Sequence, residues 1–165
     1  MTKGIFLLLG SNLGDKMMNL NNALKEIKNK VGTIEKYSLV YETAPWGNSQ
    51  QPSFLNQCVE ISSTLFPEEL LVEINLIEKQ LGRARKEKWG ERTIDIDILF
   101  YNNLVVNQPR LSIPHPAIPT RRFTLVPLCE IADHFLHPVL KMTNGQLLEQ
   151  CDDPLEVKLL NTPDL

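Results

Sequence analysis

The chain has 165 residues, of which 42% are hydrophobic and 22% are charged, a composition typical of a soluble globular protein. This length is enough for one domain with a substantial core and too short for two domains of ordinary size, so we expect a single domain over residues 1–165. The formal net charge of −3 argues against general affinity for nucleic acid or an anionic membrane. Any basic binding site must therefore be local.

The cysteines and the N-terminal residues indicate a cytoplasmic protein without a membrane partner. Cys58, Cys129 and Cys151 are far apart and form no CxxC pair, which favours free thiols in a reducing compartment over a disulfide framework or a zinc site. The first apolar run, residues 5–9, has only five residues and is too short for the core of a signal peptide. We also find no stretch of transmembrane length.

Hydrophobic periodicity predicts four strands and two helices in the first 101 residues. In chain order these are a strand over 4–10, a helix capped by Asp15 and closed by Gly32, a strand over 33–43, a loop over 44–53, a strand over 54–65, a helix opening at Pro67 and ending before Gly82, and a strand over 93–101. The Asp cap, the Pro at a helix start and the Gly after each helix are ordinary boundary signals.

The order strand–helix–strand–strand–helix–strand is that of ferredoxin-like domains. We therefore expect an α+β sandwich, with an antiparallel sheet and two helices on one face, which leaves the other face free for a site. Residues 102–113 resemble a hairpin, and residues 122–133 a short broken helix. These begin a C-terminal extension whose last 25 residues carry no clear pattern.

Two acidic residues, Asp95 and Asp97, interrupt the apolar strand over 93–101. Successive side chains of a strand alternate in direction, so both carboxylates share one face and three isoleucines share the other. Neighbouring carboxylates repel each other, and a divalent cation removes that penalty. Mg²⁺ typically takes one or two carboxylates and completes its shell with water and substrate phosphate. The alternative is that both acids simply face solvent on an edge strand.

The segment that precedes this strand, residues 79–92, contains six basic and two acidic residues, a local charge of +4. Gly82 and Gly90 favour a loop. Arginine binds phosphate oxygens through two parallel bonds, and Trp89 can stack on a flat ring. A solvated charged loop is the better explanation of such a run taken alone, but the place of this segment before the two aspartates favours a site for Mg²⁺ and polyphosphate.

Two further motifs bear on phosphate binding. Arg110, Ser112, His115, Arg121 and Arg122 form a second basic group, in which His115 stands between two prolines and could donate to a phosphate or be structural. The chain has neither a GxxxxGK[ST] loop nor a GxGxxG motif. Its GSNLGD run lacks that glycine spacing, so we interpret it as a turn with an Asp cap and leave a ligand role for Asn12 open.

Four segments resemble the 6-hydroxymethyl-7,8-dihydropterin pyrophosphokinase family of folate biosynthesis. They are LGSNLGD (9–15), YETAPWGNSQQPSFLN (41–56), LGRARKEKWGERTIDIDILFY (81–101) and RLSIPHPAIPTRRFTLVPLCEIA (110–132). They stand in the family's order and at its spacing. The resemblance implies a Mg²⁺-dependent enzyme with a ferredoxin-like core. Its reaction would transfer the β,γ-pyrophosphoryl group of ATP to the hydroxymethyl group of the pterin, giving AMP and the pterin diphosphate.

The resemblance also implies roles for individual residues. Asp95 and Asp97 would hold two Mg²⁺ ions, and with Arg83 and Arg92 they would be the catalytic residues. The residues implied to bind ATP, some of them in a lid over the nucleotide, are Glu78, Arg85, Trp89, Arg92, Ile98, Arg110, Ser112, His115 and Arg121. Those implied to bind the pterin are Thr43, Pro45, Gly47, Phe54, Asn56, Trp89 and Phe123, with the two phenylalanines on either face of the ring.

The chain departs from the family's usual residues at Ala44, Gln50, Asn75 and Pro116. These departures leave open the shape of the 44–53 loop and the details of adenine contact. A regulatory ligand-binding domain or a Mg²⁺-dependent nuclease explains the aspartates and arginines less well. We expect a cytoplasmic monomer whose partners are ATP and the pterin, without nucleic acid or membrane.

Overall fold

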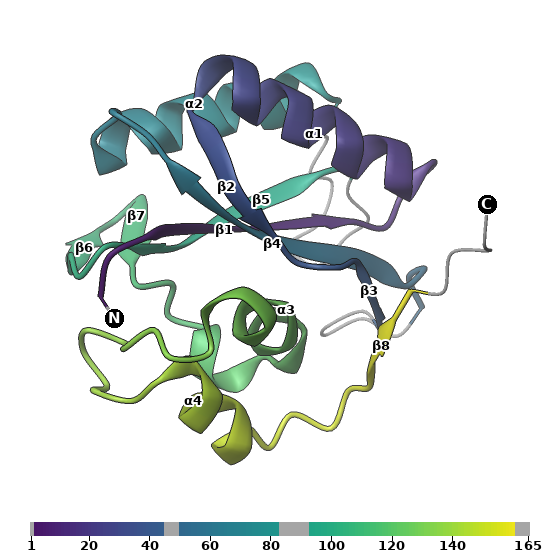
Figure 1. Cartoon of the computed structure of the whole chain (residues 1–165). Coiled ribbons are helices and arrows are strands. Elements are labelled where there is room, and N and C mark those ends of the chain that lie inside the picture. Colours follow the sequence, from purple (N-terminus) through teal and green to yellow (C-terminus); the bar gives the residue numbers. More distant parts are fainter. Residues whose placement is uncertain (1, 45–49, 83–92, 161–165) are drawn as a thin grey trace.

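The computed structural model describes residues 2–44, 50–82 and 93–160, in which one sheet lies between two pairs of helices (Figure 1). Helices α1 (Lys16–Lys30) and α2 (Pro67–Gln80) cover one face. Helices α3 (Arg122–Ala132) and α4 (Asn144–Gln150) lie on the opposite side. No helix among these residues is long and apolar enough to cross a membrane.

The sheet has six strands among the described residues, and its pairs are antiparallel. The strands are β1 (Ile5–Ser11), β2 (Thr33–Tyr37), β3 (Tyr41–Thr43), β4 (Phe54–Ser62), β5 (Asp95–Tyr101) and β8 (Val157–Leu159). Their order is β5-β1-β4-β3-β8, and β2 also pairs with β4. The ferredoxin-like α+β prediction is therefore confirmed, with β8 of the C-terminal extension added at one side.

Smaller elements follow β5. The predicted hairpin is present as β6 (Val106–Gln108) and β7 (Leu111–Ile113), and a short 3₁₀ helix, η1 (Ile118–Thr120), leads to α3. The predicted break in the helix over 122–133 is wrong. The helix continues through Pro127, which is itself buried, so packing of this stretch outweighs the backbone bond that proline cannot make.

The single strand predicted over 33–43 is also wrong, because β2 and β3 are separate. At the break, the Ser38 hydroxyl accepts a bond from the backbone N–H of Cys58 at 2.9 Å. The backbone N–H of Leu39 donates to the carboxylate of Glu130 on α3 at 2.7 Å. At this break, side chains therefore accept the bonds of backbone N–H groups that would pair with a neighbouring strand if the strand were continuous. The other predicted strands begin or end within three residues of β1, β4 and β5.

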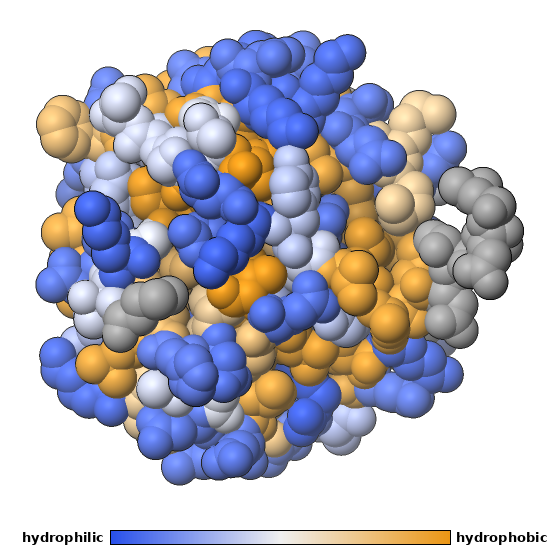
Figure 2. All heavy atoms as spheres, in the orientation of Figure 1, coloured by the Kyte–Doolittle hydropathy of each residue, from blue (hydrophilic) through white to orange (hydrophobic). Residues whose placement is uncertain are grey.

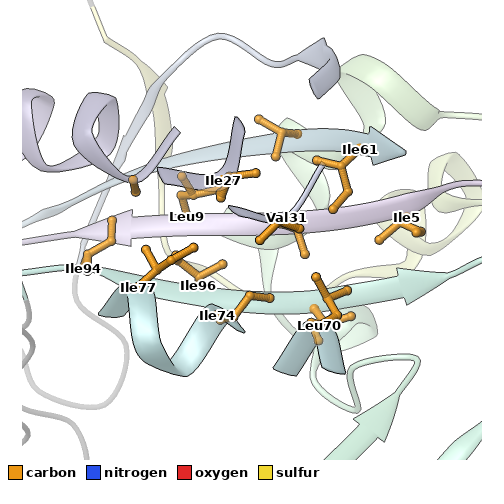
Figure 3. Packing of buried hydrophobic residues seen from close by; sticks show 14 of the residues in the cluster. Ile5, Leu9, Ile27, Val31, Ile61, Leu70, Ile74, Ile77, Ile94 and Ile96 are labelled. Carbon is orange, nitrogen blue, oxygen red and sulfur yellow. The ribbon is translucent and has the colours of Figure 1, made fainter. Parts of the chain in front are cut away.

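The core consists of two hydrophobic clusters, one on each side of the sheet. The first lies under α1 and α2 and is rich in isoleucine and leucine, including Ile27, Leu70 and Ile74 (Figure 3). The second joins β1 and β5 to α3 and α4 and contains Phe6, Phe100 and Phe135. The prediction that the second face of the sheet is free is therefore wrong. A site on this face must lie where α3 leaves the sheet uncovered.

Local signals at the helix starts agree with the sequence. The Asp15 carboxylate accepts a bond from the backbone N–H of Met18 at 3.0 Å, which confirms the predicted cap of α1. Pro67 opens α2, and Glu69 accepts a bond from the backbone N–H of Phe66 at 2.9 Å. The GSNLGD run therefore contains a helix cap, as expected.

We expect Phe135→Ala to lower the free energy of unfolding by about 3–5 kcal/mol, the usual cost of deleting a buried aromatic ring. Phe135 is fully buried, and its ring centroid lies 4.6 Å from that of Phe100 and 5.1 Å from that of Phe6. Urea unfolding would measure the loss. Phe66→Ala is the matched control, because Phe66 is 70% exposed and its loss should change stability by about 0.5 kcal/mol or less. Equal losses would contradict the assignment of the second cluster.

Candidate active site

The acidic pair lies on β5 as the alternation predicts. Asp95 and Asp97 are half-buried on one side of the strand, while Ile96 and Ile98 on the other side are buried in the first cluster. The backbone N–H of Ile96, between the two aspartates, donates to the buried carboxylate of Glu78 at 2.9 Å. Helix α2 therefore holds the peptide that joins the acidic residues.

A cavity opens in front of this pair and encloses about 510 Å³, part of it open to solvent. Its lining combines two aromatic rings, two carboxylates, an amide and a guanidinium with small and apolar residues. The lining residues are Leu8, Gly10, Thr43, Ala44, Phe54, Asn56, Asp95, Asp97, Arg121 and Phe123. The structure thus brings together the predicted metal ligands, Arg121 and four of the predicted pterin residues.

The Asn56 side chain is held in one orientation at the back of this cavity. Its amide nitrogen donates to the Thr43 hydroxyl at 3.1 Å, and the residue is 3% exposed. Gly10 lies opposite Asn56 in the β1–β4 pairing, and a Cβ atom at Gly10 would be 2.8 Å from the Asn56 amide oxygen. Gly10 was not among the predicted site residues, although a glycine in a strand often marks such a close approach.

The opposite wall comes from the start of α3. Arg121 precedes the helix and Phe123 is its second residue. The Arg121 guanidinium carbon lies 5.6 Å from the centroid of the Phe123 ring, within the range of a cation–π contact. This wall therefore presents both a flat ring and a positive charge to the cavity.

A second cavity, of about 660 Å³ and also partly open to solvent, lies on the other side of Asp97. It combines apolar side chains with an arginine, a serine and a histidine. The lining residues are Leu71, Ile96, Asp97, Ile98, Pro109, Arg110, Leu111, Ser112, His115 and Pro116. Four residues predicted on the ATP side, Ile98, Arg110, Ser112 and His115, are gathered here. Asp97 lines both cavities.

His115 is a neutral hydrogen-bond donor in this arrangement. Burial, followed by the nearby Arg121 charge, lowers its pKa to about 4, while Asp95 opposes the shift. The backbone N–H of Ala117 donates to His115 Nδ1 at 3.1 Å. Because Nδ1 accepts a bond, the single proton of the neutral ring belongs on Nε2. The neutral ring can therefore donate a hydrogen bond from Nε2–H, as the predicted contact with a phosphate requires.

The Asn12 amide contacts the loop that precedes Phe54. Its nitrogen donates to the Gln51 side-chain oxygen at 2.9 Å and to the Pro52 carbonyl at 3.3 Å. The Lys16 ammonium donates to the Ser53 carbonyl at 2.9 Å. The GSNLGD run and the lysine that follows it therefore anchor residues 51–53. Other predicted site residues, namely Pro45, Gly47, Arg83, Arg85, Trp89 and Arg92, lie outside the described residues.

Comparison with known proteins gives the family. The family model for 7,8-dihydro-6-hydroxymethylpterin-pyrophosphokinase (HPPK) matches residues 6–133. The chain belongs to this family. It is 40% identical over 137 residues to the 2-amino-4-hydroxy-6-hydroxymethyldihydropteridine pyrophosphokinase of Aquifex aeolicus, covering 83% of this chain and 85% of the relative. It is 38% identical over 155 residues to the Haemophilus influenzae enzyme, covering 93% and 96%.

Solved structures of HPPK-DHPS from Plasmodium falciparum share the fold. One of them, the A437G form with SDX-DHP, matches with a TM-score of 0.75 at 19% identity and covers 91% of this HPPK chain. The chain spans only 46% of that Plasmodium chain, and 22% of the folic acid synthesis protein FOL1 of Dictyostelium discoideum, to which it is 41% identical over 143 residues. The HPPK fold is therefore also found within longer chains.

We expect the imidazole of His115 to titrate with a pKa of about 4. NMR from pH 3 to 8 would follow the chemical shifts of the ring carbons, with His115→Gln used to assign them. These shifts give the pKa and identify the Nε2–H tautomer. Because the folded pKa lies below the ordinary value of about 6.5, the unfolded chain binds more protons between these values. This residue's contribution to stability is therefore complete above pH 6.5 and is lost as the pH falls towards 4. Titration near 6.5 would contradict the burial of the ring.

Proposed function

We propose that the chain transfers the β,γ-pyrophosphoryl group of ATP to 6-hydroxymethyl-7,8-dihydropterin between the two cavities that meet at Asp97. Family membership gives the reaction itself, a pyrophosphoryl transfer to the hydroxymethylpterin in folate biosynthesis with ATP as co-substrate. The proposal concerns where and how this chain carries it out. The observation behind it is that Asp97 lines both the aromatic cavity and the cavity around His115.

The aromatic cavity fits the pterin. A flat polar heterocycle requires apolar faces above and below it and hydrogen-bonding groups in its plane. Phe54 and Phe123 supply the faces, and the fixed amide of Asn56 supplies an edge partner beside Thr43. Backbone groups of Thr43, Pro45 and Gly47, together with Trp89, complete this proposed site.

The cavity around His115 fits the nucleotide. Leu71, Ile98 and Pro116 offer apolar surface to a base. Arg110, Ser112 and the Nε2–H of His115 offer donors to ribose and phosphate oxygens, and Arg121 lies on the pterin side of the phosphates. The roles of Glu78, Arg83, Arg85, Trp89 and Arg92 in ATP binding and catalysis remain predictions.

The acidic pair fits magnesium. Two half-buried carboxylates on one side of a strand are hard oxygen donors in the number that Mg²⁺ takes from a protein. We propose that Asp95 and Asp97 hold two such ions with the triphosphate. Bound Mg²⁺ would neutralise charge on the phosphates during the transfer. The donor set therefore agrees with a Mg²⁺-dependent diphosphokinase.

The residues of the chain contribute mainly alignment and charge. In the transfer, the hydroxymethyl oxygen forms a bond to the β-phosphorus and loses its proton to water, and the bond from that phosphorus to the α,β-bridging oxygen breaks, so that AMP leaves with the bridging oxygen. Reactions of this type depend on positioning and charge neutralisation more than on a strong base. The pterin walls hold the nucleophile, while His115 and Arg110 hold the phosphates on the far side of Asp97 and Arg121 approaches them from the pterin side.

We further propose that the chain acts as a cytoplasmic monomer with one domain over residues 1–165. Six of the described strands form one sheet with helices on both faces, β6 and β7 form a separate hairpin, and the three cysteines are free thiols. ATP and the pterin are its proposed partners, without nucleic acid or membrane. Sedimentation at working concentration would test the monomer, since a stable dimer would double the mass of 18.8 kDa.

The reaction can be tested directly by ³¹P NMR of the purified protein with ATP, Mg²⁺ and 6-hydroxymethyl-7,8-dihydropterin. We expect the resonance of AMP to grow together with those of a pterin diphosphate. ADP as the nucleotide product would identify an ordinary kinase or ATPase instead. Bound pterin without turnover would indicate a binding protein.

We expect Asp97→Asn to lower kcat by about 10²–10³, the size of effect seen when one group that stabilises transition-state charge is removed. The fold should survive, since the change relieves repulsion between carboxylates. Turnover and Mg²⁺ dependence are the measurements, with EDTA removing activity from the wild type and Mg²⁺ restoring it. Asp152→Asn, on an exposed residue, is the control. An active Asp97→Asn enzyme would rule out the proposed role.

A further inference from the structure

We propose that Asp153, in the C-terminal extension, is a positioning residue for the pterin cavity. It fixes the first turn of α3, which carries Arg121 and Phe123 into that cavity. The inference rests on the proposed function for its consequence, and on contacts of the described residues for its geometry. Asp153 carries no role in the reaction as proposed above.

The Asp153 carboxylate is buried and uses both oxygens. The residue is 5% exposed. Its Oδ2 accepts a bond from the backbone N–H of Arg122 at 3.0 Å, and its Oδ1 accepts one from the backbone N–H of Leu155 at 3.0 Å. One carboxylate therefore joins the start of α3 to a segment that lies 31 residues further along the chain.

The Arg122 side chain strengthens the same junction. Its Nε donates to the backbone carbonyl of Asp153 at 3.1 Å, and its Nη2 donates to the carbonyl of Cys151 at 2.9 Å. Arg122 thus points to the C-terminal segment, while its two neighbours, Arg121 and Phe123, line the cavity. Three bonds in total connect Arg122 to residues 151 and 153.

Helix α3 lacks a cap from its own N-cap residue. The side chain of Arg121 makes no capping bond, and the first N–H groups of a helix have no partner within the helix. The carboxylate of Asp153, in a distant part of the chain, accepts a bond from the first of these groups, the N–H of Arg122. A carboxylate at this position also interacts favourably with the helix dipole. Asp153 therefore serves as a long-range cap.

Loss of this cap should act on one cavity more than on the other. The first turn of α3 supplies an aromatic wall and a guanidinium to the pterin cavity. The second cavity is lined by residues of α2, β5 and the segment over 109–116. A looser first turn should therefore weaken pterin binding more than nucleotide binding, because it displaces both Arg121 and Phe123 from the pterin cavity, whereas the nucleotide loses only the proposed contact of its phosphates with Arg121. General destabilisation would not separate the two ligands in this way.

Calorimetry on Asp153→Ala and Asp153→Asn tests the inference. We expect the Kd for pterin, measured with Mg²⁺ and a non-hydrolysable ATP analogue, to rise about five- to tenfold in Asp153→Ala, comparable to the loss of a helix cap. Asp153→Asn keeps an acceptor oxygen and should show a smaller rise. The Kd for the ATP analogue alone should rise by no more than about twofold, since only Arg121 of this turn is proposed to contact the phosphates and the other nucleotide residues are distant from Asp153. Asp152→Ala, the exposed neighbour, should bind both ligands as the wild type does.

Hydrogen exchange tests the positioning without any ligand. The backbone amides of Arg122 and Phe123 should exchange at least about tenfold faster in Asp153→Ala, because opening of the first turn becomes easier. If Asp153→Ala does not fold, Asp153→Asn and Arg122→Gln provide the same comparison with milder changes. Melting curves would ensure that all variants are folded at the temperature of the measurement.

Three outcomes would overturn the inference: unchanged exchange in a folded variant, an unchanged pterin Kd, or an equal rise of both Kd values. A failure of the proposed function would give a different result from any of these three outcomes. A wild type that forms no pterin diphosphate would refute the function, while exchange at Arg122 and Phe123 would still decide whether Asp153 fixes the turn.

Discussion

The pleat of β5 is the constraint on which the site depends. Ile96 and Ile98 are buried under α1 and α2, and complete burial of such a side chain contributes about 1.5–3 kcal/mol. Because side chains alternate along a strand, that burial obliges Asp95 and Asp97 to face the opposite side. A shift of the pairing register by one residue would turn the isoleucines to the site and the aspartates to the core. Pairing with β1 on one edge and the bond to Glu78 on the other hold the register.

Features that depend on local pattern could be predicted from the sequence. The strand and helix order follows from hydrophobic period, the start of α1 from the Asp15 cap, and the faces of β5 from simple alternation. The family motifs also identified residues that meet in space. Phe54 and Phe123 are 69 positions apart in the sequence, yet both line one cavity.

Features that depend on distant segments could not be derived in this way. The break between β2 and β3 involves a bond from Leu39 to Glu130, 91 residues away. The cap at Arg122 comes from Asp153, in a stretch without clear periodicity. One signal was available for the covered second face of the sheet. The run over residues 5–9 has no polar side and is buried throughout, as expected of a strand that is covered on both faces.

The aromatic walls of the proposed pterin cavity belong to different layers of the fold. Phe54 lies on β4 in the sheet, and Phe123 lies on α3. The gap between them is therefore set by how closely α3 packs on the sheet, through buried contacts of residues such as Leu125 and Leu128 in the second cluster. Because protein interiors are close-packed, this spacing resists compression. The extra helical layer that hides most of the second sheet face is thus also what gives the proposed pterin site its second wall.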